Sequence, residues 1–193
     1  KNIFGNKFVI FSGGKLEYRK GQDLVVAAFK IFHQKYPNSL LIFSWENQWN
    51  KIVQTLEYSH HTNAYPKLDH NNDLLIDNWL LENGLPDGSF INLGQIANKR
   101  FPDLYSSVDM ALFPNRCEPG TNLVAMEAMA MGIPCIISAN TGHLDIICNE
   151  TCYALLNQKD VKSFHPYNYV DGWGEASIDE ILDKMEKLYL DKY

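Results

Sequence analysis

The chain has 193 residues, of which 17 are Lys or Arg and 23 are Asp or Glu, and its formal net charge is −6. This length suits one well-packed domain better than two. The acidic balance and the scattered basic residues disfavour nucleic acid and anionic membranes as partners. No run of eighteen apolar residues predicts a transmembrane segment. The first residues, which begin with Lys1, resemble neither a signal nor a transit peptide, so we expect a start inside a longer protein.

The four cysteines, Cys117, Cys135, Cys148 and Cys152, form no C-x-x-C pair. Cys135 lies in an apolar, strand-like run, where a thiol acts as a small hydrophobic side chain. This usage favours a reducing, cytoplasmic setting. A zinc site at Cys148 and Cys152 is disfavoured because zinc needs four convergent ligands and no second pair is visible.

Short apolar runs alternate along the chain with helical patterns, which is typical of βαβ units around a mostly parallel sheet. In chain order we predict a strand at 8–12, a helix at 21–36, a strand at 39–44, helices near 46–59 and 70–83, a strand at 90–93, a helix near 101–107, a strand at 110–113, a helix near 122–131, a strand at 135–138, a helix near 142–148, a strand at 153–156 and a helix at about 177–190. The expected fold is an α/β, Rossmann-like doubly wound parallel sheet with helices on both faces.

Such sheets bind ligands beyond the carboxyl ends of their strands. After the first strand the sequence runs Ser12-Gly13-Gly14-Lys15 and then Arg19-Lys20-Gly21 before the helix. Glycines let a ligand approach the backbone, and helix-terminal amides with two lysines stabilise phosphate. A tight turn with solvated lysines is the other interpretation. The segment is neither G-x-G-x-x-G nor a P-loop, which disfavours NAD-binding and ATPase functions.

The segment 114–134 predicts a helix that is apolar on every side except at Glu127. A carboxylate in a buried helix needs partners, and two ribose hydroxyls could supply them if a diphosphate rested on the amides near Thr121–Leu123. Glu118 precedes the helix cap and could accept hydrogen bonds from a sugar. The alternative is that Glu127 pairs with a nearby Lys or Arg and that Glu118 merely flanks a turn.

Several segments of the chain, in order, resemble the motifs of retaining glycosyltransferases built from two Rossmann-like domains (GT-B type, family 4, also called glycosyl transferases group 1). The segment from Glu118 to Glu127 resembles the E-x7-E donor motif. GGKLEYRKGQDLVVAAF resembles G-R-L-x-x-x-K-G-x-D-x-L-x-x-A, PDLYSSVDMALFP resembles L-Y-x-x-A-D-x-x-x-x-P-S, and MEAMAMGIPCIISANTGHLDII resembles L-E-A-M-A-x-G-x-P-V-I-A-x-x-x-G-G-x-x-E-I-I.

The resemblance implies that residues 1–193 form one C-terminal, sugar-nucleotide-binding domain and that an N-terminal acceptor domain is absent from the chain. It also implies the role of each candidate residue. Glu118 would be the catalytic-site carboxylate that holds the transferred sugar, and Glu127 would hold the ribose. The donor diphosphate would be bound by Gly14, Lys15, Lys20, Thr121, Asn122 and Leu123. The nucleobase would contact Gln95 and Ile96.

Three features depart from the family pattern. Eight residues instead of seven separate Glu118 from Glu127. Lys15 stands where the family has Arg, so a single ammonium charge replaces a guanidinium that can donate two parallel hydrogen bonds. His143 replaces the second glycine of a Gly-Gly pair, and we expect it at the surface or as a helix cap. His60 and His61 are expected to be solvated.

The implied reaction transfers a hexose, with retention, from a nucleoside diphosphate to a polysaccharide or glycolipid acceptor. UDP or a UDP-sugar is the expected ligand, with UDP-glucose as the first candidate donor, and no metal cofactor is expected. We expect the domain alone to bind donor but to turn over slowly or not at all, and any membrane attachment to be made through the missing domain. The alternatives are a non-catalytic nucleotide-sugar-binding module, and an epimerase or phosphorylase of the same architecture.

Overall fold

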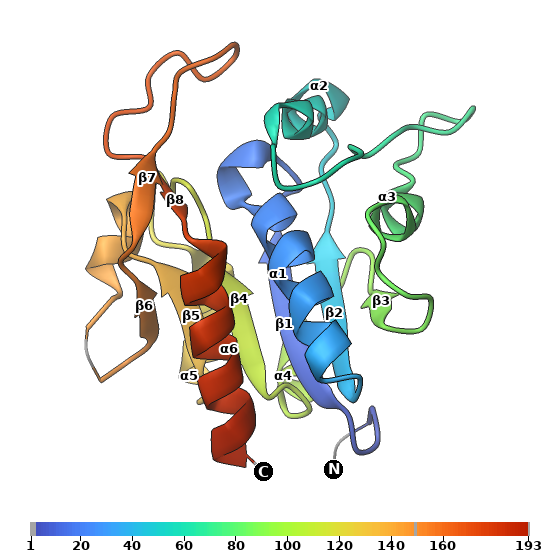
Figure 1. Cartoon of the computed structure of the whole chain (residues 1–193), viewed down its shortest axis with the longest axis vertical. Helices are drawn as coiled ribbons and strands as arrows, with labels where there is room; N and C mark the ends of the chain where they lie inside the picture. The colour runs from blue at the N-terminus through green and yellow to red at the C-terminus, as the bar shows by residue number, and fades with distance from the viewer. Residues whose placement is uncertain (1–2, 149, 193) are drawn as a thin grey trace.

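In the computed structural model, which describes residues 3–148 and 150–192, the chain folds around a six-stranded parallel sheet (Figure 1). Its order is β3-β2-β1-β4-β5-β6, which is the strand order of a doubly wound dinucleotide-binding fold. The predicted fold class is therefore confirmed. The strands are β1 (Phe8–Gly14), β2 (Ser39–Trp45), β3 (Phe90–Asn92), β4 (Met110–Phe113), β5 (Cys135–Ser138) and β6 (Tyr153–Leu155).

Helices cover both faces of this sheet. The α-helices are α1 (Gln22–Lys35), α2 (Asn50–Val53), α3 (Ile76–Glu82), α4 (Phe101–Tyr105), α5 (Leu123–Ala130) and α6 (Ile178–Lys192). Short 3-10 turns are η1 (Tyr18–Lys20), η2 (Gln54–Tyr58), η3 (Asn98–Arg100) and η4 (Thr141–Asp145). Figure 1 shows α1 and α6 side by side on one face, with α4 and α5 on the other.

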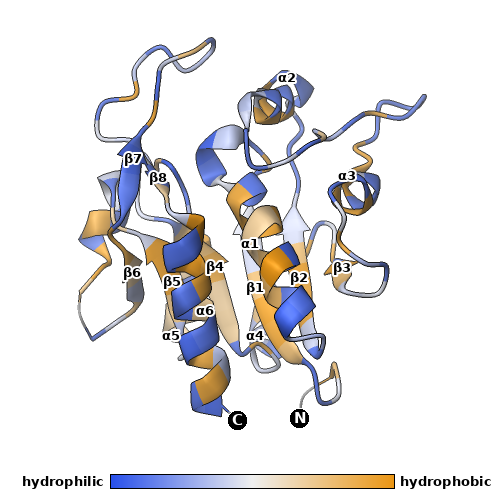
Figure 2. Cartoon of the chain, in the orientation of Figure 1, coloured by the Kyte–Doolittle hydropathy of each residue, from blue (hydrophilic) through white to orange (hydrophobic). Residues whose placement is uncertain are grey.

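The central strand β1 explains this two-layer packing. Phe8 and Ile10 join one buried cluster with α1 and α6, whereas Val9 and Phe11 join a second cluster with α4 and α5. Because successive side chains of a strand point to opposite faces, a continuous apolar run is what a sheet covered on both sides requires. Figure 2 shows this hydrophobic band along the strands.

The path from β1 into α1 depends on Gly21. Its φ of 72° lies in the left-handed region, and a Cβ there would meet the carbonyl oxygen of Pro114 at 2.3 Å. Only glycine combines that backbone conformation with such a close approach. The contact fixes η1, and with it Lys20, against the end of β4.

Several helix predictions are too long. The region 46–59 holds only α2 and η2, the region 70–83 contains α3 preceded by an isolated bridge between Leu68 and Leu74, and the region 142–148 contains η4. In the bridged segment the backbone of Asn72 has a positive φ of 70°, which a helix excludes.

An antiparallel hairpin of β7 (Gln158–Asp160) and β8 (Gly174–Ala176) was not predicted. Its strands have three residues each and lack apolar alternation, so they leave little pattern in the sequence. In Figure 1 the hairpin lies at the same end as α2, toward which the arrowhead of β2 points. No helix among the described residues has the length and apolarity needed to cross a bilayer.

Candidate functional site

A cavity of about 440 Å³ lies between the carboxyl ends of β1 and β2 and the start of α5. Five of the predicted site residues line it. They are Gly14, Lys15, Gln95, Leu123 and Glu127. They come from the end of β1 and the loop after it, from the loop after β3 and from α5, so the sheet topology brings together residues that lie far apart in sequence.

Glu127 lies on an exposed face of α5 and lines this cavity. The predicted burial of α5 on all sides is wrong, because only Ala125 and Ala128 are buried in it. These two small side chains let the helix pack closely on β4 and β5, and Leu123 and Met126 are exposed on its outer side. Solvent satisfies the Glu127 carboxylate, which forms no hydrogen bond or ion pair with another described residue, and the acid faces the open cavity.

The start of α5 is capped by Asn122. The side-chain oxygen of Asn122 accepts a hydrogen bond from the backbone amide of Ala125 at 3.3 Å, which is the usual geometry of an N-cap. Thr121, just before it, is exposed, and Leu123 is 68% exposed. The amides of a helix's first turn have no partner inside the helix, so this end of α5 can receive an anion at the cavity.

Lys20 and Glu118 form a second group, which does not line the cavity. The ammonium of Lys20 forms an ion pair with the Glu118 carboxylate, and the Asn115 side-chain amide donates to the same carboxylate oxygen at 2.9 Å. Arg19 lies 3.8 Å from the other oxygen. Glu118 is 8% exposed. The two residues predicted to hold sugar and diphosphate therefore contact each other, and a phosphate would compete with Glu118 for Lys20.

Lys15 and Gln95 also line the cavity. The Lys15 side chain is exposed, and its ammonium lies 4.4 Å from the ring centroid of Trp49, a cation–π contact. Gln95 is exposed and lines the cavity, but Ile96 packs against the hydrophobic cluster beneath α4 and α5. Of the pair predicted to contact a nucleobase, the structure therefore places only Gln95 at the cavity.

Residues 1–167 match the family described as glycosyl transferases group 1. The chain belongs to this family. The matched region covers both the cavity and the Lys20–Glu118 pair.

Known relatives are distant in sequence but similar in fold. Mannosylfructose-phosphate synthase of Agrobacterium fabrum (strain C58 / ATCC 33970) is 25% identical over 134 residues, which are 69% of this chain and 26% of the synthase. The C-terminal domain of the group 1 family protein LpcC from Francisella tularensis has 21% identity and a TM-score of 0.65, covering 96% of this chain and 76% of that one. Anabaena HepE, solved in complex with UDP and glucose, has 16% identity and a TM-score of 0.63, covering 98% and 40%.

This group 1 chain thus spans about a quarter of the length of the synthase and 40% of HepE. At these identities the solved structures establish the shared fold. They do not transfer a ligand or an acceptor to this chain.

His143, where the group 1 pattern has glycine, is fully buried, so the expectation of a surface or capping residue is wrong. One ring nitrogen, Nδ1, lies 3.0 Å from the carbonyl oxygen of Ser138, and Nε2 lies 3.0 Å from the side-chain nitrogen of Asn122. These partners assign the proton to Nδ1 and let Nε2 accept from Asn122. Burial lowers the pKa of His143 to about 4, so the ring is neutral and holds the cap of α5 in place.

Arg116, in the loop between β4 and Glu118, is a structural residue that the sequence patterns did not single out. It is fully buried and donates to both Asp23 oxygens at 2.8 and 2.6 Å, to Glu175 at 2.8 Å and to the Tyr18 carbonyl at 2.7 Å. Burial alone raises the pKa of Asp23, but the Arg116 guanidinium more than offsets this and holds it below its ordinary value. Its partners are distant along the chain, so spacing could not reveal them.

The two histidines expected to be solvated differ from each other. The His60 side chain is 70% exposed, as expected, but that of His61 is 18% exposed and lies 3.0 Å from Glu175. The expectation for His61 is therefore wrong, because the unpredicted strand β8 brings Glu175 to its ring.

Proposed function

We propose that residues 1–193 form the donor-binding domain of a retaining glycosyltransferase and that this domain binds a UDP-sugar, with UDP-glucose as the first candidate. The observation that carries the proposal is one cavity that combines the exposed N-terminal end of α5, the Lys15 ammonium and the Glu127 carboxylate. A helix N-terminus and an ammonium bind a diphosphate, and a carboxylate one turn along that helix accepts hydrogen bonds from ribose hydroxyls.

In the proposed complex the diphosphate draws Lys20 away from Glu118. The released Glu118 carboxylate then accepts hydrogen bonds from the hydroxyls of the transferred sugar. Gly14, Thr121, Asn122 and Leu123 offer close backbone approach to the phosphates, and Gln95 lies beside the base. Our sequence-based assignment of Ile96 to the base would require its side chain to leave the hydrophobic cluster.

The chemical step breaks the bond between the anomeric carbon and the diphosphate, whose leaving oxygen gains negative charge. Preorganised amides and ammonium groups aimed at that oxygen stabilise the transition state more than the ground state. We propose that these groups carry the stabilisation without a divalent ion at the diphosphate. The acceptor, a polysaccharide or glycolipid, would be held by an N-terminal domain, so residues 1–193 alone should bind donor and transfer sugar slowly or not at all.

Calorimetric titration of the chain with UDP, UMP and UDP-glucose tests the proposal. Lys20→Ala should weaken UDP binding about tenfold or more, because one charge-assisted hydrogen bond contributes about 1.5–3 kcal/mol. It should weaken UMP binding much less, since UMP lacks the second phosphate. Glu127→Gln should weaken both nucleotides alike through the shared ribose.

The matched controls are Lys51→Ala and Glu57→Gln, which alter exposed residues outside the cavity and should leave all affinities unchanged. Absence of UDP and UDP-glucose binding at millimolar concentration would refute the donor-site assignment. Equal losses for UDP and UMP in Lys20→Ala would remove Lys20 from the second phosphate.

A further inference from the structure

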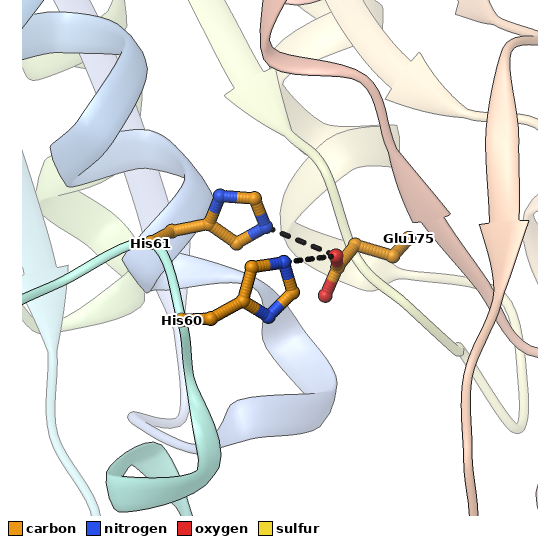
Figure 3. Close-up of side chains that lie close together, drawn as sticks. All are labelled: His60, His61 and Glu175. Carbon is orange, nitrogen blue, oxygen red and sulfur yellow. Dashed lines mark hydrogen bonds and ion pairs between the residues drawn. The ribbon is translucent and has the colours of Figure 1, made fainter.

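Two consecutive histidines and one glutamate converge, with both imidazole rings pointing at the carboxylate (Figure 3). His60 and His61 follow η2, and Glu175 is the middle residue of β8. The Nε2 atoms of His60 and His61 lie 3.3 and 3.0 Å from the same carboxylate oxygen, Oε1 of Glu175. Among the residues that the structure describes, this is the one group of three potential metal ligands, and its ligand atoms all lie within 4.8 Å of one another.

We propose that His60, His61 and Glu175 form a Zn²⁺ site with one coordination position open to solvent. Zinc binds histidine nitrogen and carboxylate oxygen at about 2.0–2.2 Å in a tetrahedron, so neighbouring ligand atoms lie roughly 3.3–3.5 Å apart. The two measured separations from Oε1 are close to that edge length. Small side-chain rotations therefore suffice to seat the ion.

Hydrogen bonds to the second carboxylate oxygen of Glu175, Oε2, orient this side chain for metal binding. Oε2 of Glu175 accepts a hydrogen bond from Nε of buried Arg116 at 2.8 Å and from the Tyr18 hydroxyl at 3.4 Å. These contacts fix the carboxylate plane and leave Oε1 facing the two imidazoles. Metal ligands are commonly oriented by such outer partners, whose loss weakens metal binding about 10–100-fold.

Zinc binds a carboxylate in its deprotonated form and an imidazole in its neutral form. In the structure, Nε2 of His61 is at hydrogen-bond distance from Oε1. Zinc would bind Nε2 of both rings, and each ring would then carry its proton on Nδ1.

The donor set also selects the kind of ion. Two imidazoles and one carboxylate suit zinc and related transition metals, whereas Mg²⁺ and Ca²⁺ prefer oxygen ligands only. The exposed His60 side chain leaves the fourth position to water. No member of the triad lines the cavity of about 440 Å³, so the ion would not contact a donor bound there.

A bound ion would join the loop after η2 to the β7/β8 hairpin through His61 and Glu175, which are 114 residues apart in sequence. It would also hold Glu175 on Arg116, which donates to the Tyr18 carbonyl at the start of η1. The inferred role of the ion is structural: it would stabilise the contact between the loop after η2 and the β7/β8 hairpin.

Titration of the chelator-treated chain with Zn²⁺, followed by calorimetry, tests the inference. We expect one Zn²⁺ per chain, at least about tenfold weaker binding in His60→Gln and in His61→Gln, and no comparable binding of Mg²⁺. Zn²⁺ at a hundredfold excess over its Kd should raise the Tm by about 5 °C or more. Circular dichroism checks that both variants fold.

Two control variants separate this site from other zinc ligands. His70→Gln removes an exposed histidine elsewhere and Cys148→Ser removes an exposed thiol, and both should bind Zn²⁺ as the unmodified chain does. Failure to bind Zn²⁺ below millimolar concentration would overturn the inference. So would unchanged affinity in the folded double variant His60→Gln/His61→Gln, or loss of binding in Cys148→Ser.

Discussion

His143 is a buried, neutral histidine that connects the end of β5 to the cap of α5. Its position gives it two effects: it orients Asn122 beside the candidate phosphate site, and it makes folding sensitive to mild acid. The second effect follows from the lowering of its pKa from 6.5 to about 4, caused chiefly by burial.

Because the pKa of His143 is lowered in the folded chain, the two states bind a proton at different pH values. In the unfolded chain His143 is protonated below about pH 6.5, and in the folded chain only below about pH 4. Stability is therefore lost as the pH falls through this window and is unaffected above it. Between pH 7 and pH 5 the loss from this residue should be on the order of 2 kcal/mol. Urea unfolding at the two pH values should show a smaller difference in His143→Gln than in the unmodified chain.

The matched control for this pH effect is His70→Gln. The His70 side chain is 87% exposed, so its removal should leave the pH dependence as it is. If His143→Gln and the unmodified chain lose the same stability between pH 7 and pH 5, His143 is not the buried neutral group described above.

Among the elements, the loop before α5 and the turn η4 are in direct contact. The Gly142 amide donates to the Glu118 carbonyl at 2.8 Å. A Cβ on Gly142 would lie 2.0 Å from the Gly120 carbonyl oxygen and 2.6 Å from that of Glu118. These are backbone atoms, so the loop as a whole would have to shift, and Glu118 and Thr121 would shift with it.

Gly142→Ala should therefore destabilise the fold by about 1–3 kcal/mol, as overpacking does, and should weaken UDP binding if the loop forms the donor site. Gly120→Ala is the matched control in the same loop, because a Cβ on Gly120 meets no atom within 4 Å. Urea unfolding and UDP titration of both variants make the comparison. Equal stability of the two variants would contradict the close contact between loop and turn.

The elements also show why sequence reasoning succeeded for the sheet and failed elsewhere. Continuous apolar runs such as residues 8–11 mark strands covered on both faces. The carboxyl ends of parallel strands meet at one edge, which is why distant residues such as Gly14 and Glu127 could be assigned to one candidate site. The helix α5 is apolar all round, so periodicity could not tell its buried face from its exposed one.

Partners joined only by tertiary structure left no pattern in the sequence. The ion pair of Lys20 with Glu118 spans 98 residues, and the contact of His61 with Glu175 spans 114. The latter depends on the β7/β8 hairpin, whose short polar strands give no alternating signal. Motif spacing identified the residues of the loop around Glu118 but not the contacts among them.

On the scale of the whole molecule, α6 closes the hydrophobic core. Ile181, Met185 and Leu188 are buried at helical spacing along one face, and Tyr189 packs edge-on against Phe8 with ring centroids 5.0 Å apart. The final helix thus lies beside α1 on the same face of the sheet, as Figure 1 shows, and reaches the start of β1 through Tyr189.

Met185→Ala should lower the free energy of unfolding by about 2–5 kcal/mol, because it leaves a cavity in the core. Leu190→Ala, on the outer face of the same helix where the side chain is 62% exposed, should change it by less than about 0.5 kcal/mol. Urea denaturation of the two variants measures both values. Similar effects of the two substitutions would show that α6 does not pack as described.

The positions of the Arg116 partners in the sequence affect the order in which parts of the chain can fold during synthesis. The Arg116 guanidinium has partners at residues 18, 23 and 175, and until residue 175 has emerged from the ribosome one of its two carboxylate partners is still missing. The loop beside Glu118 would then rest on an incompletely neutralised cation. During synthesis, the loop that carries Glu118 would accordingly gain its full support only after β8 has emerged.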